Sequence, residues 1–482
     1  MFGAYSKSEG TGKRGGSSGA PAAASSVAAD YARLLLESVG QPVADDLAVP
    51  SDPHPALTAA ATGLLALTGY ADGPPVPPPG HLAACARGAL AALRALAPRH
   101  GDAALATLDG AALLGERAAV LRLARRGTTS AGGHCRLVRA RDGWLAINLP
   151  RPDDRATVPA WLGTSVGADP WPTIDHVAGR RRAGSLVARA RLLGLAAAEA
   201  SPPISTAPPW HRVGARGRRA VPPRERAPLV LDLSSLWAGP LAAALLARAG
   251  ARVVKIESTR RPDGVRGGPA AFFDLLHADK ESVALDFATA TGRRALVALV
   301  ARADVVIESA RPRAMHQLGI DPAALVRARP GLTWISITGY GRGGAAARWI
   351  GFGDDAGTAA GLAHATGRLA GGDTPLFCGD AIADPLTGMH AAVAALAGYR
   401  RGGGLLAALA LRDVAAHALA FGPAASAAVI RSLGEPAGAP AWEVVAGGIR
   451  APVRAPRARA PHVRARAFGA DTDPILREFH VA

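Results

Sequence analysis

The stretch that decides the fold runs from residue 228 to residue 257 and reads PLVLDLSSLWAGPLAAALLARAGARVVKIE. Two short apolar runs, 228–233 and 252–257, flank a small-residue turn and an Ala/Leu-rich segment predicted to be helical over 241–249. Both runs are apolar throughout, which is typical of strands buried on both faces. Strand, helix and strand in this order predict the start of a parallel sheet.

The same alternation continues along the chain. The sequence predicts further strands at 282–287, 304–307 and 332–338, and helices at 292–303, 322–328 and 384–400. The fold class is therefore α/β. We expect a doubly wound parallel-sheet domain in the C-terminal half, over 228–400, fused to a mainly helical N-terminal half that carries a small α+β subdomain.

Composition suggests boundaries for the other parts. Residues 1–27 are rich in Gly, Ser and Ala and predict a disordered tail, and 28–126 have a helical pattern. Residues 127–200 predict the small α+β subdomain, with a hairpin of 135–139 and 144–149 and helical segments at 154–163 and 176–199. The Pro- and Arg-rich segment 201–227 reads as a linker, and 401–482 as C-terminal helices and a tail.

The overall composition excludes several classes. No apolar run reaches 18 residues, so no transmembrane helix is predicted, and the N-terminus has no secretory h-region. Three widely spaced cysteines indicate neither a disulfide scaffold nor a zinc site, so we expect no metal and a cytoplasmic protein. The net charge of +17 comes mostly from scattered Arg residues without interleaved aromatics, so we expect no nucleic-acid partner.

The sharpest chemical feature is Asp384, which precedes Pro385 and an Ala-rich helix. One interpretation is a helix cap, because Asp before Pro is a strong helix start. The other is a carboxylate nucleophile that the helix N-terminus keeps ionised. Spacing alone favours the cap. The turn 234–240 lacks a GxGxxG pattern and offers only a modest anion site at a helix start, and no GxSxG serine elbow is present.

An ordered set of motifs resembles the class III CoA-transferases, a family that includes formyl-CoA transferase and carnitine CoA-transferase, with α-methylacyl-CoA racemase as a relative. Each motif is weak alone, but together they follow the family's order. The matching segments are Val230–Leu233, Ala238–Pro240, Gly250–Glu257, Lys280–Asp286, Ala303–Glu308, Arg311-Pro312, Leu318-Gly319, Ser336–Gly341 and Ala383–Gly388, followed by Leu411–Asp413 and the ending near Gly469–Leu476.

This resemblance implies that Asp384 is the catalytic aspartate, which attacks an acyl-CoA thioester and passes CoA to a carboxylic acid. CoA is then a substrate rather than a resident cofactor, the partners are an acyl-CoA and an acceptor acid, and a homodimer is expected. Gly132 and Gly133 resemble the family's glycine loop, whose amides stabilise oxyanions; the alternative is a plain loop before a strand. The CoA-binding candidates are Trp237, Ala238, Gly239, Arg260, Arg261, Lys280 and Arg311, against the alternative of ordinary surface charge.

An internal repeat and two departures qualify the resemblance. The pattern Gly63…Thr68-Gly69…Gly88 parallels Gly361…Thr366-Gly367…Gly388, and Ala84 stands where the second copy has Asp384. The first copy is therefore predicted to be catalytically inactive. Phe352 replaces the histidine of the racemase relatives, and Asp354 or Asp355 is the candidate for the family's missing glutamate. The alternatives are an acyl-CoA racemase or isomerase, and a catalytically silent CoA-binding relative.

Overall fold

A seven-stranded sheet organises the C-terminal half of the computed structural model, which describes residues 26–43, 47, 49, 53–222, 226–423, 427–434 and 441–480. The strand order is β4-β10-β9-β8-β5-β6-β7, with β4 antiparallel to β10 and the other neighbours parallel. The strands are β4 (Arg212–Arg216), β5 (Leu229–Leu233), β6 (Arg252–Ser258), β7 (Glu281–Leu285), β8 (Val305–Glu308), β9 (Thr333–Thr338) and β10 (Leu405–Ala410).

The order of the six parallel strands creates a switch point between β5 and β8. The chain winds outward from β5 through β6 to β7, then returns to β8 and winds the other way. Loops after β5 and β8 therefore leave the sheet in opposite directions, and a doubly wound sheet binds ligands in the crevice between them. The Ser235 amide donates to the Ser309 hydroxyl at 3.0 Å across this point.

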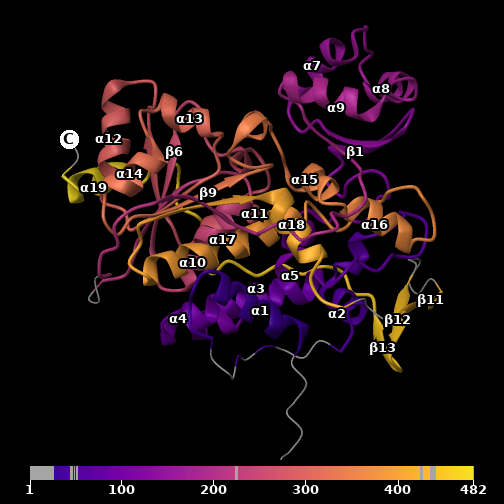
Figure 1. Cartoon of the computed structure of the whole chain (residues 1–482), viewed down its shortest axis with the longest axis horizontal. Coiled ribbons are helices and arrows are strands. Elements are labelled where there is room, and N and C mark those ends of the chain that lie inside the picture. The colour runs from indigo at the N-terminus through magenta and orange to yellow at the C-terminus, as the bar shows by residue number, and fades with distance from the viewer. Residues whose placement is uncertain are drawn as a thin grey trace, which may run out of the picture.

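Helices cover both faces of the sheet (Figure 1). One face packs on α10 (Ala238–Arg248), α11 (Ala270–His277), α17 (Ala383–Arg400) and α18 (Leu411–Leu419). The other packs on α12 (Ala290–Val300), α13 (Pro312–Gln317), α14 (Pro322–Ala328) and α19 (Thr472–Glu478). Val230 contributes to the first core and Leu231 to the second, which explains why the strand runs are apolar at every position.

The N-terminal helices form a further layer below α10 and α17 (Figure 1). They are α1 (Val27–Ser38), α2 (Pro55–Thr62), α3 (Leu82–Leu96), α4 (Arg99–Ala106), α5 (Gly110–Leu113) and α6 (Glu116–Leu121). Buried side chains of α1 and α3 share one continuous apolar core with α10 and α17. The helical segment predicted over 28–126 is thus packed directly on the sheet domain.

The internal repeat has a structural counterpart. Gly88 of α3 lies against α1, where an added Cβ would sit 2.5 Å from the Ala28 carbonyl oxygen. Gly388 of α17 lies in the same way against α10, where a Cβ would sit 2.7 Å from the Ala238 carbonyl oxygen. The α1–α3 pair therefore packs like the α10–α17 pair. Ala84, in the first turn of α3, is buried and offers no nucleophile.

Local features of the two copies also agree. Gly63 and Gly361 both adopt left-handed backbone, with φ of +89° and +96°. Thr68 and Thr366 each donate their hydroxyl to a backbone carbonyl four residues earlier, at 3.0 and 2.8 Å. α15 (Gly353–Ala359) precedes the second copy, which runs from Gly361 through α16 (Leu362–Leu369) into α17.

Residues 135–199 build a small lobe that stands apart from the sheet in Figure 1. The sheet β1 (Cys135–Ala140), β2 (Gly143–Asn148) and β3 (Ala196–Glu199) packs on α7 (Pro152–Leu162), α8 (Trp171–Ala178) and α9 (Ala183–Leu192). The predicted hairpin is confirmed. The helical prediction for 176–199 is wrong at its end, because 196–199 pairs with β2 despite its run of alanines.

Two further segments differ from their prediction. Residues 212–216, inside the expected linker, form the edge strand β4, and 405–410, inside the expected helical tail, form β10. A third sheet of β11 (Val429–Ser432), β12 (Trp442–Ala446) and β13 (Ile449–Pro452) follows. Most of the expected disordered tail, residues 1–25, lies outside the described residues. Among those that are described, no helix is long and apolar enough to cross a membrane.

Candidate active site

Asp384 lies in the first turn of α17 but does not cap it. The helix begins at Ala383 with Ile382 as the capping position, so Asp384 is its second residue. The side chain accepts a hydrogen bond from the Gly353 amide at 3.0 Å, from the start of α15. The interpretation of Asp384 as a helix cap is therefore wrong. Its carboxylate is turned toward α15, and the residue as a whole is only partly buried.

The backbone turn before α17 holds this arrangement. Ala381 has a φ of +43°, an uncommon conformation for a residue other than glycine. Its amide donates to the Asp354 carboxylate at 3.0 Å, and its carbonyl accepts from the Asp384 amide at 2.8 Å. Strained backbone of this kind persists where the surroundings fix it, and it is common at functional sites.

An arginine from the N-terminal half completes the cluster. Arg117 of α6 makes a bidentate pair with Asp380, with Nε to Oδ2 at 2.8 Å and Nη2 to Oδ1 at 2.5 Å. The Asp380 carboxylate is fully buried, whereas the Arg117 side chain is 25% exposed. The guanidinium also lies over the Trp237 ring, 5.5 Å from its centroid. Asp380, four residues before Asp384, is thus tied to the helical layer.

Burial favours the neutral form of two carboxylic acids of the cluster, Asp384 and Asp354. Burial raises the pKa of Asp384 to about 7, with Asp354 adding to the effect and Arg117 opposing it. Burial and the charge of Asp380 raise the pKa of Asp354 to about 7. Desolvation thus opposes the ionisation of Asp384 that the helix N-terminus is expected to favour. The site sits near the balance between acid and carboxylate at neutral pH.

The two candidate acids before the nucleophile separate by environment. Asp355 is fully buried and accepts hydrogen bonds from the Tyr340 hydroxyl at 2.6 Å and the Phe352 amide at 2.9 Å. It therefore braces the start of α15. Asp354 is partly exposed and electrostatically coupled to Asp384, so it is the one available to chemistry.

The glycine loop lies beside this cluster, although it precedes Asp384 by about 250 residues. A Cβ added to Gly132 would sit 2.9 Å from Nη2 of Arg117 and 4.0 Å from Oδ1 of Asp380. A side chain here would press on the ion pair. The Gly133 amide already donates to the Ser130 carbonyl at 2.8 Å, so it is not free to stabilise an oxyanion. The structure thus brings Gly132 to the site and corrects the prediction for the Gly133 amide.

The carboxyl end of β5 lies at the other side of Arg117. Trp237 is buried at the start of α10, and its Nε1 has no hydrogen-bond partner among the described residues. Ala238 and Gly239 are buried in the first turn, where a Cβ on Gly239 would overlap the Ser234 side chain at 2.2 Å. Gly239 thus allows the turn to fold back on itself, next to the switch point.

The basic residues predicted to bind CoA differ in their exposure to solvent. Arg260, Arg261 and Arg311 are exposed in the loops after β6 and β8, although Arg260 pairs with Asp286 at 3.1 Å. Lys280 is buried. Its Nζ donates to the Asp232 carboxylate at 2.8 Å and the Pro240 carbonyl at 2.9 Å. The prediction that Lys280 binds CoA phosphates is corrected by this burial, because its charge is already matched inside the core.

Sequence reasoning missed Arg117, Asp380 and the selection of Asp354 over Asp355. Arg117 is one of many scattered arginines, and nothing in the local sequence marks it. Asp380 lies four residues before Asp384, and this spacing is the one available signal. Among the described residues, no group of three or more His, Cys, Asp or Glu side chains is placed to hold a metal ion.

Comparison with known proteins finds one family model that matches part of the chain. Residues 228–438 match the model of CoA-transferase family III. Mouse succinyl-CoA:glutarate CoA-transferase is 33% identical over 187 residues, which cover 36% of this chain and 42% of that protein. The alpha subunit of succinyl-CoA–L-malate CoA-transferase from Chloroflexus aurantiacus is 32% identical over 36% of this chain and 42% of its own length. Succinate–glutarate CoA-transferase of Agrobacterium fabrum is 32% identical over 41% and 54%.

Solved structures are matched over a similar part of the chain. A CaiB/BaiF family protein from Brucella suis is 29% identical, with a TM-score of 0.35 over 41% of this chain and 56% of that one. A Mycobacterium tuberculosis protein is 29% identical, with a TM-score of 0.36 over 40% and 55%. The chain thus spans about two-fifths to one-half of the length of the relatives it matches.

Proposed function

We propose that the chain, whose residues 228–438 match the model of CoA-transferase family III, transfers CoA from an acyl-CoA thioester to a carboxylic acid, with Asp384 as the nucleophile. The observation that carries the proposal is the position of Asp384. Asp384 is a half-buried residue in the first turn of α17, and the Gly353 amide holds its carboxylate beside the Arg117–Asp380 pair. The duplicated helix α3 has no acid at the corresponding position.

The chemistry needs one nucleophile and four steps. The Asp384 carboxylate attacks the thioester carbonyl, the C–S bond breaks, and CoA leaves as a thiolate while an aspartyl–acyl anhydride remains. The thiolate then attacks the aspartyl carbonyl and releases the acyl group as a carboxylate, leaving an aspartyl–CoA thioester. The acceptor carboxylate attacks this thioester to give a second anhydride and free thiolate. The thiolate finally attacks the acceptor's carbonyl, which forms the new acyl-CoA and regenerates Asp384.

The residues around Asp384 have separate roles in this scheme. The raised pKa of Asp384 makes the carboxylate more basic and therefore a better nucleophile once it is ionised. The positive charge of Arg117 offsets the burial and keeps the ionised form accessible. The Gly353 amide, 3.0 Å from Oδ2, is placed to donate to the oxygen on which negative charge gathers when the thiolate attacks.

The proposed site is formed within one chain. Arg117 and Gly132 come from the N-terminal half, whereas Asp380 and Asp384 come from the sheet domain. The N-terminal half thus supplies parts of the proposed site that lie outside the matched residues 228–438. A homodimer remains a prediction, and the cluster described here does not depend on one.

CoA is proposed to lie across the switch point between β5 and β8. Trp237 lines its inner end next to Arg117, and the exposed Arg260, Arg261 and Arg311 surround its outer end. Guanidinium groups suit phosphate oxygens. Because the relatives are named for succinyl-CoA and a dicarboxylate, we propose succinyl-CoA as donor and a dicarboxylic acid as acceptor.

The racemase alternative needs a second acid/base group facing the α-carbon of the substrate. At the position of the racemase histidine the chain has Phe352, whose backbone amide is used by Asp355. The transferase is therefore favoured. The silent relative differs from both in binding CoA without turnover.

The test is a transfer assay with purified full-length protein, succinyl-CoA and glutarate, followed by separation of the CoA esters. The proposal predicts glutaryl-CoA formation that is lost in Asp384→Ala and kept in Asp373→Ala, an exposed control in the turn after α16. Deuterium exchange into the acyl α-carbon without transfer would favour the racemase. Saturable CoA binding without either reaction would favour the silent relative.

A further inference from the structure

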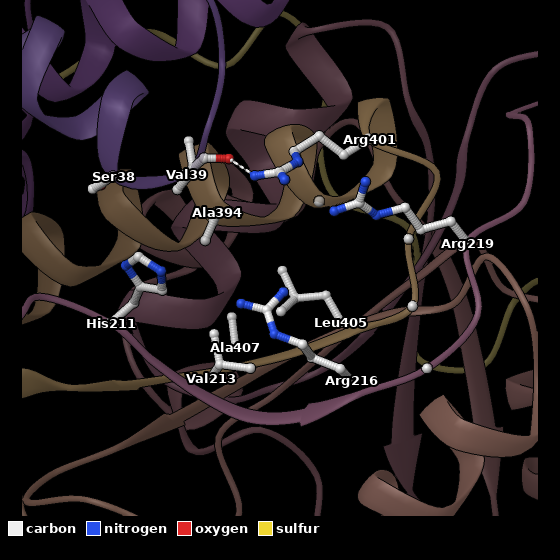
Figure 2. Close-up of a pocket in the computed structure, with 14 residues that line it drawn as sticks. Ser38, Val39, His211, Val213, Arg216, Arg219, Ala394, Arg401, Leu405 and Ala407 are labelled. Carbon is white, nitrogen blue, oxygen red and sulfur yellow. Dashed lines mark hydrogen bonds between the residues drawn. The ribbon is translucent and has the colours of Figure 1, made fainter.

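A cavity lies away from Asp384, at the edge of the sheet that β4 and β10 form. Its volume is about 180 Å³, and it is a hollow open to solvent, lined by the end of α1, the second half of α17 and the strands β4 and β10 (Figure 2). Ser38 and Val39 line one side, and Ala394 and Gly398 of α17 line another. Three arginines also line it: Arg216, Arg219 and Arg401.

These arginines give the cavity a strong positive charge. Figure 2 shows their three guanidinium groups directed into the same hollow. No Asp or Glu is among its described lining residues, and within the described part of the chain neither Arg216 nor Arg219 forms an ion pair. Like charges that share one hollow repel each other. An anion placed between the three groups would remove this repulsion.

The backbone around the cavity is fixed in place. Arg401 is held by a hydrogen bond from its Nη1 to the Val39 carbonyl at 2.5 Å. The glycines that follow it pack against neighbouring backbone, because a Cβ on Gly403 would sit 1.9 Å from the Gly331 carbonyl oxygen and one on Gly404 2.6 Å from that of Gly217. The loop between α17 and β10 is thus anchored, and Arg401 projects from it.

A polar group with no partner lies in the same wall. His211 lines the cavity, and its Nδ1 is buried without a hydrogen-bond partner among the described residues. Buried polar atoms are normally paired, so this nitrogen is available to bond a ligand atom in the cavity.

From these observations we propose that this cavity binds a phosphate-bearing anion, at a site separate from the one that holds Asp384. Three guanidinium groups match the charge of a phosphate or diphosphate better than that of a single carboxylate, and their planar forks suit phosphate oxygens. Whole-ligand pockets usually measure about 300–1,000 Å³. A cavity of about 180 Å³ therefore fits an anionic group rather than an entire nucleotide.

The site is independent of the proposed transferase reaction. Asp384 is in the first turn of α17, whereas Ala394 and Gly398 lie 10 and 14 residues further along. At about 1.5 Å of rise per residue, this places the cavity roughly 15–21 Å down the helix. Leu405, at the start of β10, also lines the cavity, whereas the switch point lies at the carboxyl ends of the strands. An anion bound here does not occupy the space of an acyl-CoA at the switch point.

The test is calorimetric titration of the full-length protein with pyrophosphate at low salt. We expect saturable binding of one pyrophosphate, weakened at least about tenfold in Arg216→Gln and Arg401→Gln, since each removes a charge-assisted hydrogen bond. Arg302→Gln, an exposed arginine after α12, is the control and should bind like the unchanged protein. Orthophosphate and ADP, titrated in parallel, distinguish a free phosphate from the phosphate end of a nucleotide.

The proposal would be overturned by the absence of saturable binding, by equal weakening in Arg302→Gln, or by weakening in Arg311→Gln instead, which would place the anion at the switch point. Succinate binding as tight as pyrophosphate would also refute the phosphate class. Circular dichroism confirms that each variant is folded. If Arg401→Gln does not fold, Arg216→Gln decides, because Arg216 is an exposed side chain on an edge strand.

Discussion

Arg117→Gln is the perturbation that most directly probes how the two halves build one site. Arg117 makes both of its short bonds to Asp380, whose carboxylate is fully buried. Removing one partner of a buried ion pair costs about 3–5 kcal/mol, because an uncompensated charge remains. The Arg117 side chain is 25% exposed, so water can reach the vacated side. We therefore expect the lower end, about 3 kcal/mol, or roughly a hundredfold in the folded-to-unfolded ratio.

The same change alters the acid–base behaviour of the site. The charge of Arg117 opposes the burial that raises the pKa of Asp384 to about 7. Without it this pKa rises further, so a smaller fraction of Asp384 is ionised at neutral pH. Since only the carboxylate attacks the thioester, the acidic limb of the kcat/KM profile shifts to higher pH. The neighbouring Asp354 titrates in the same range, so the profile reports the pair.

Urea unfolding and a pH–rate profile measure the two effects. Arg260→Gln is the stability control, because the Arg260 side chain is 68% exposed in its pair with Asp286, and such pairs contribute about 0–1 kcal/mol. The double variant Arg117→Gln/Asp380→Asn should recover part of the loss, since no buried charge is left unpaired. The reasoning would be refuted if the free energy of unfolding of Arg117→Gln lies within about 0.5 kcal/mol of that of the unchanged chain and the acidic limb of its kcat/KM profile does not shift.

Three further outcomes follow from the packing and the charges. Gly388→Ala should destabilise the fold by about 1–3 kcal/mol in urea unfolding, because its Cβ would lie 2.7 Å from a backbone carbonyl oxygen of α10, whereas Gly143→Ala, with open space around it, should stay within about 0.5 kcal/mol. Lys280→Met should cost about 3–5 kcal/mol of stability, because Asp232 stays buried without its ion-pair partner, and a thermal melt in which this variant is as stable as the unchanged protein would contradict the ion pair. Arg311→Gln should raise the KM for the acyl-CoA with little change in kcat, and an unchanged KM at low salt would remove Arg311 from the CoA site.

The parallel core of the sheet could be predicted from the sequence because its strands are buried on both faces and apolar throughout, as in 229–233. The strands β4 and β10, which form one edge of the sheet, could not be predicted from the sequence. Residues 212–216 are mostly exposed, so no pattern marks them. Residues 405–410 read LLAALA, which favours a helix, but they pair with β9 and β4. Pairing between distant segments decides these strands, and a local pattern does not contain it.

The candidate site, like the sheet, could be predicted only in part from the sequence. Asp384 could be found because its neighbours form part of an ordered set of motifs. Its environment could not, because Arg117 reaches Asp380 across 263 positions of the chain. The sequence favours Asp384 as a cap because proline is a common first helical residue, but the helix starts at Ala383, two residues before Pro385. The buried ion pair of Lys280 could not be predicted either, because its motif gives no sign that Asp232 lies opposite it.

The measurement that tests the central claim most directly is trapping of the covalent intermediate. The full-length protein is incubated with succinyl-CoA, then with hydroxylamine, and its peptides are analysed by mass spectrometry beside Asp384→Ala. An aspartyl anhydride or thioester would be converted to a hydroxamate, and the account predicts it on the peptide that contains Asp384 and nowhere else. Glutaryl-CoA formed with no modification of that peptide, or a hydroxamate that persists in Asp384→Ala, would contradict the account.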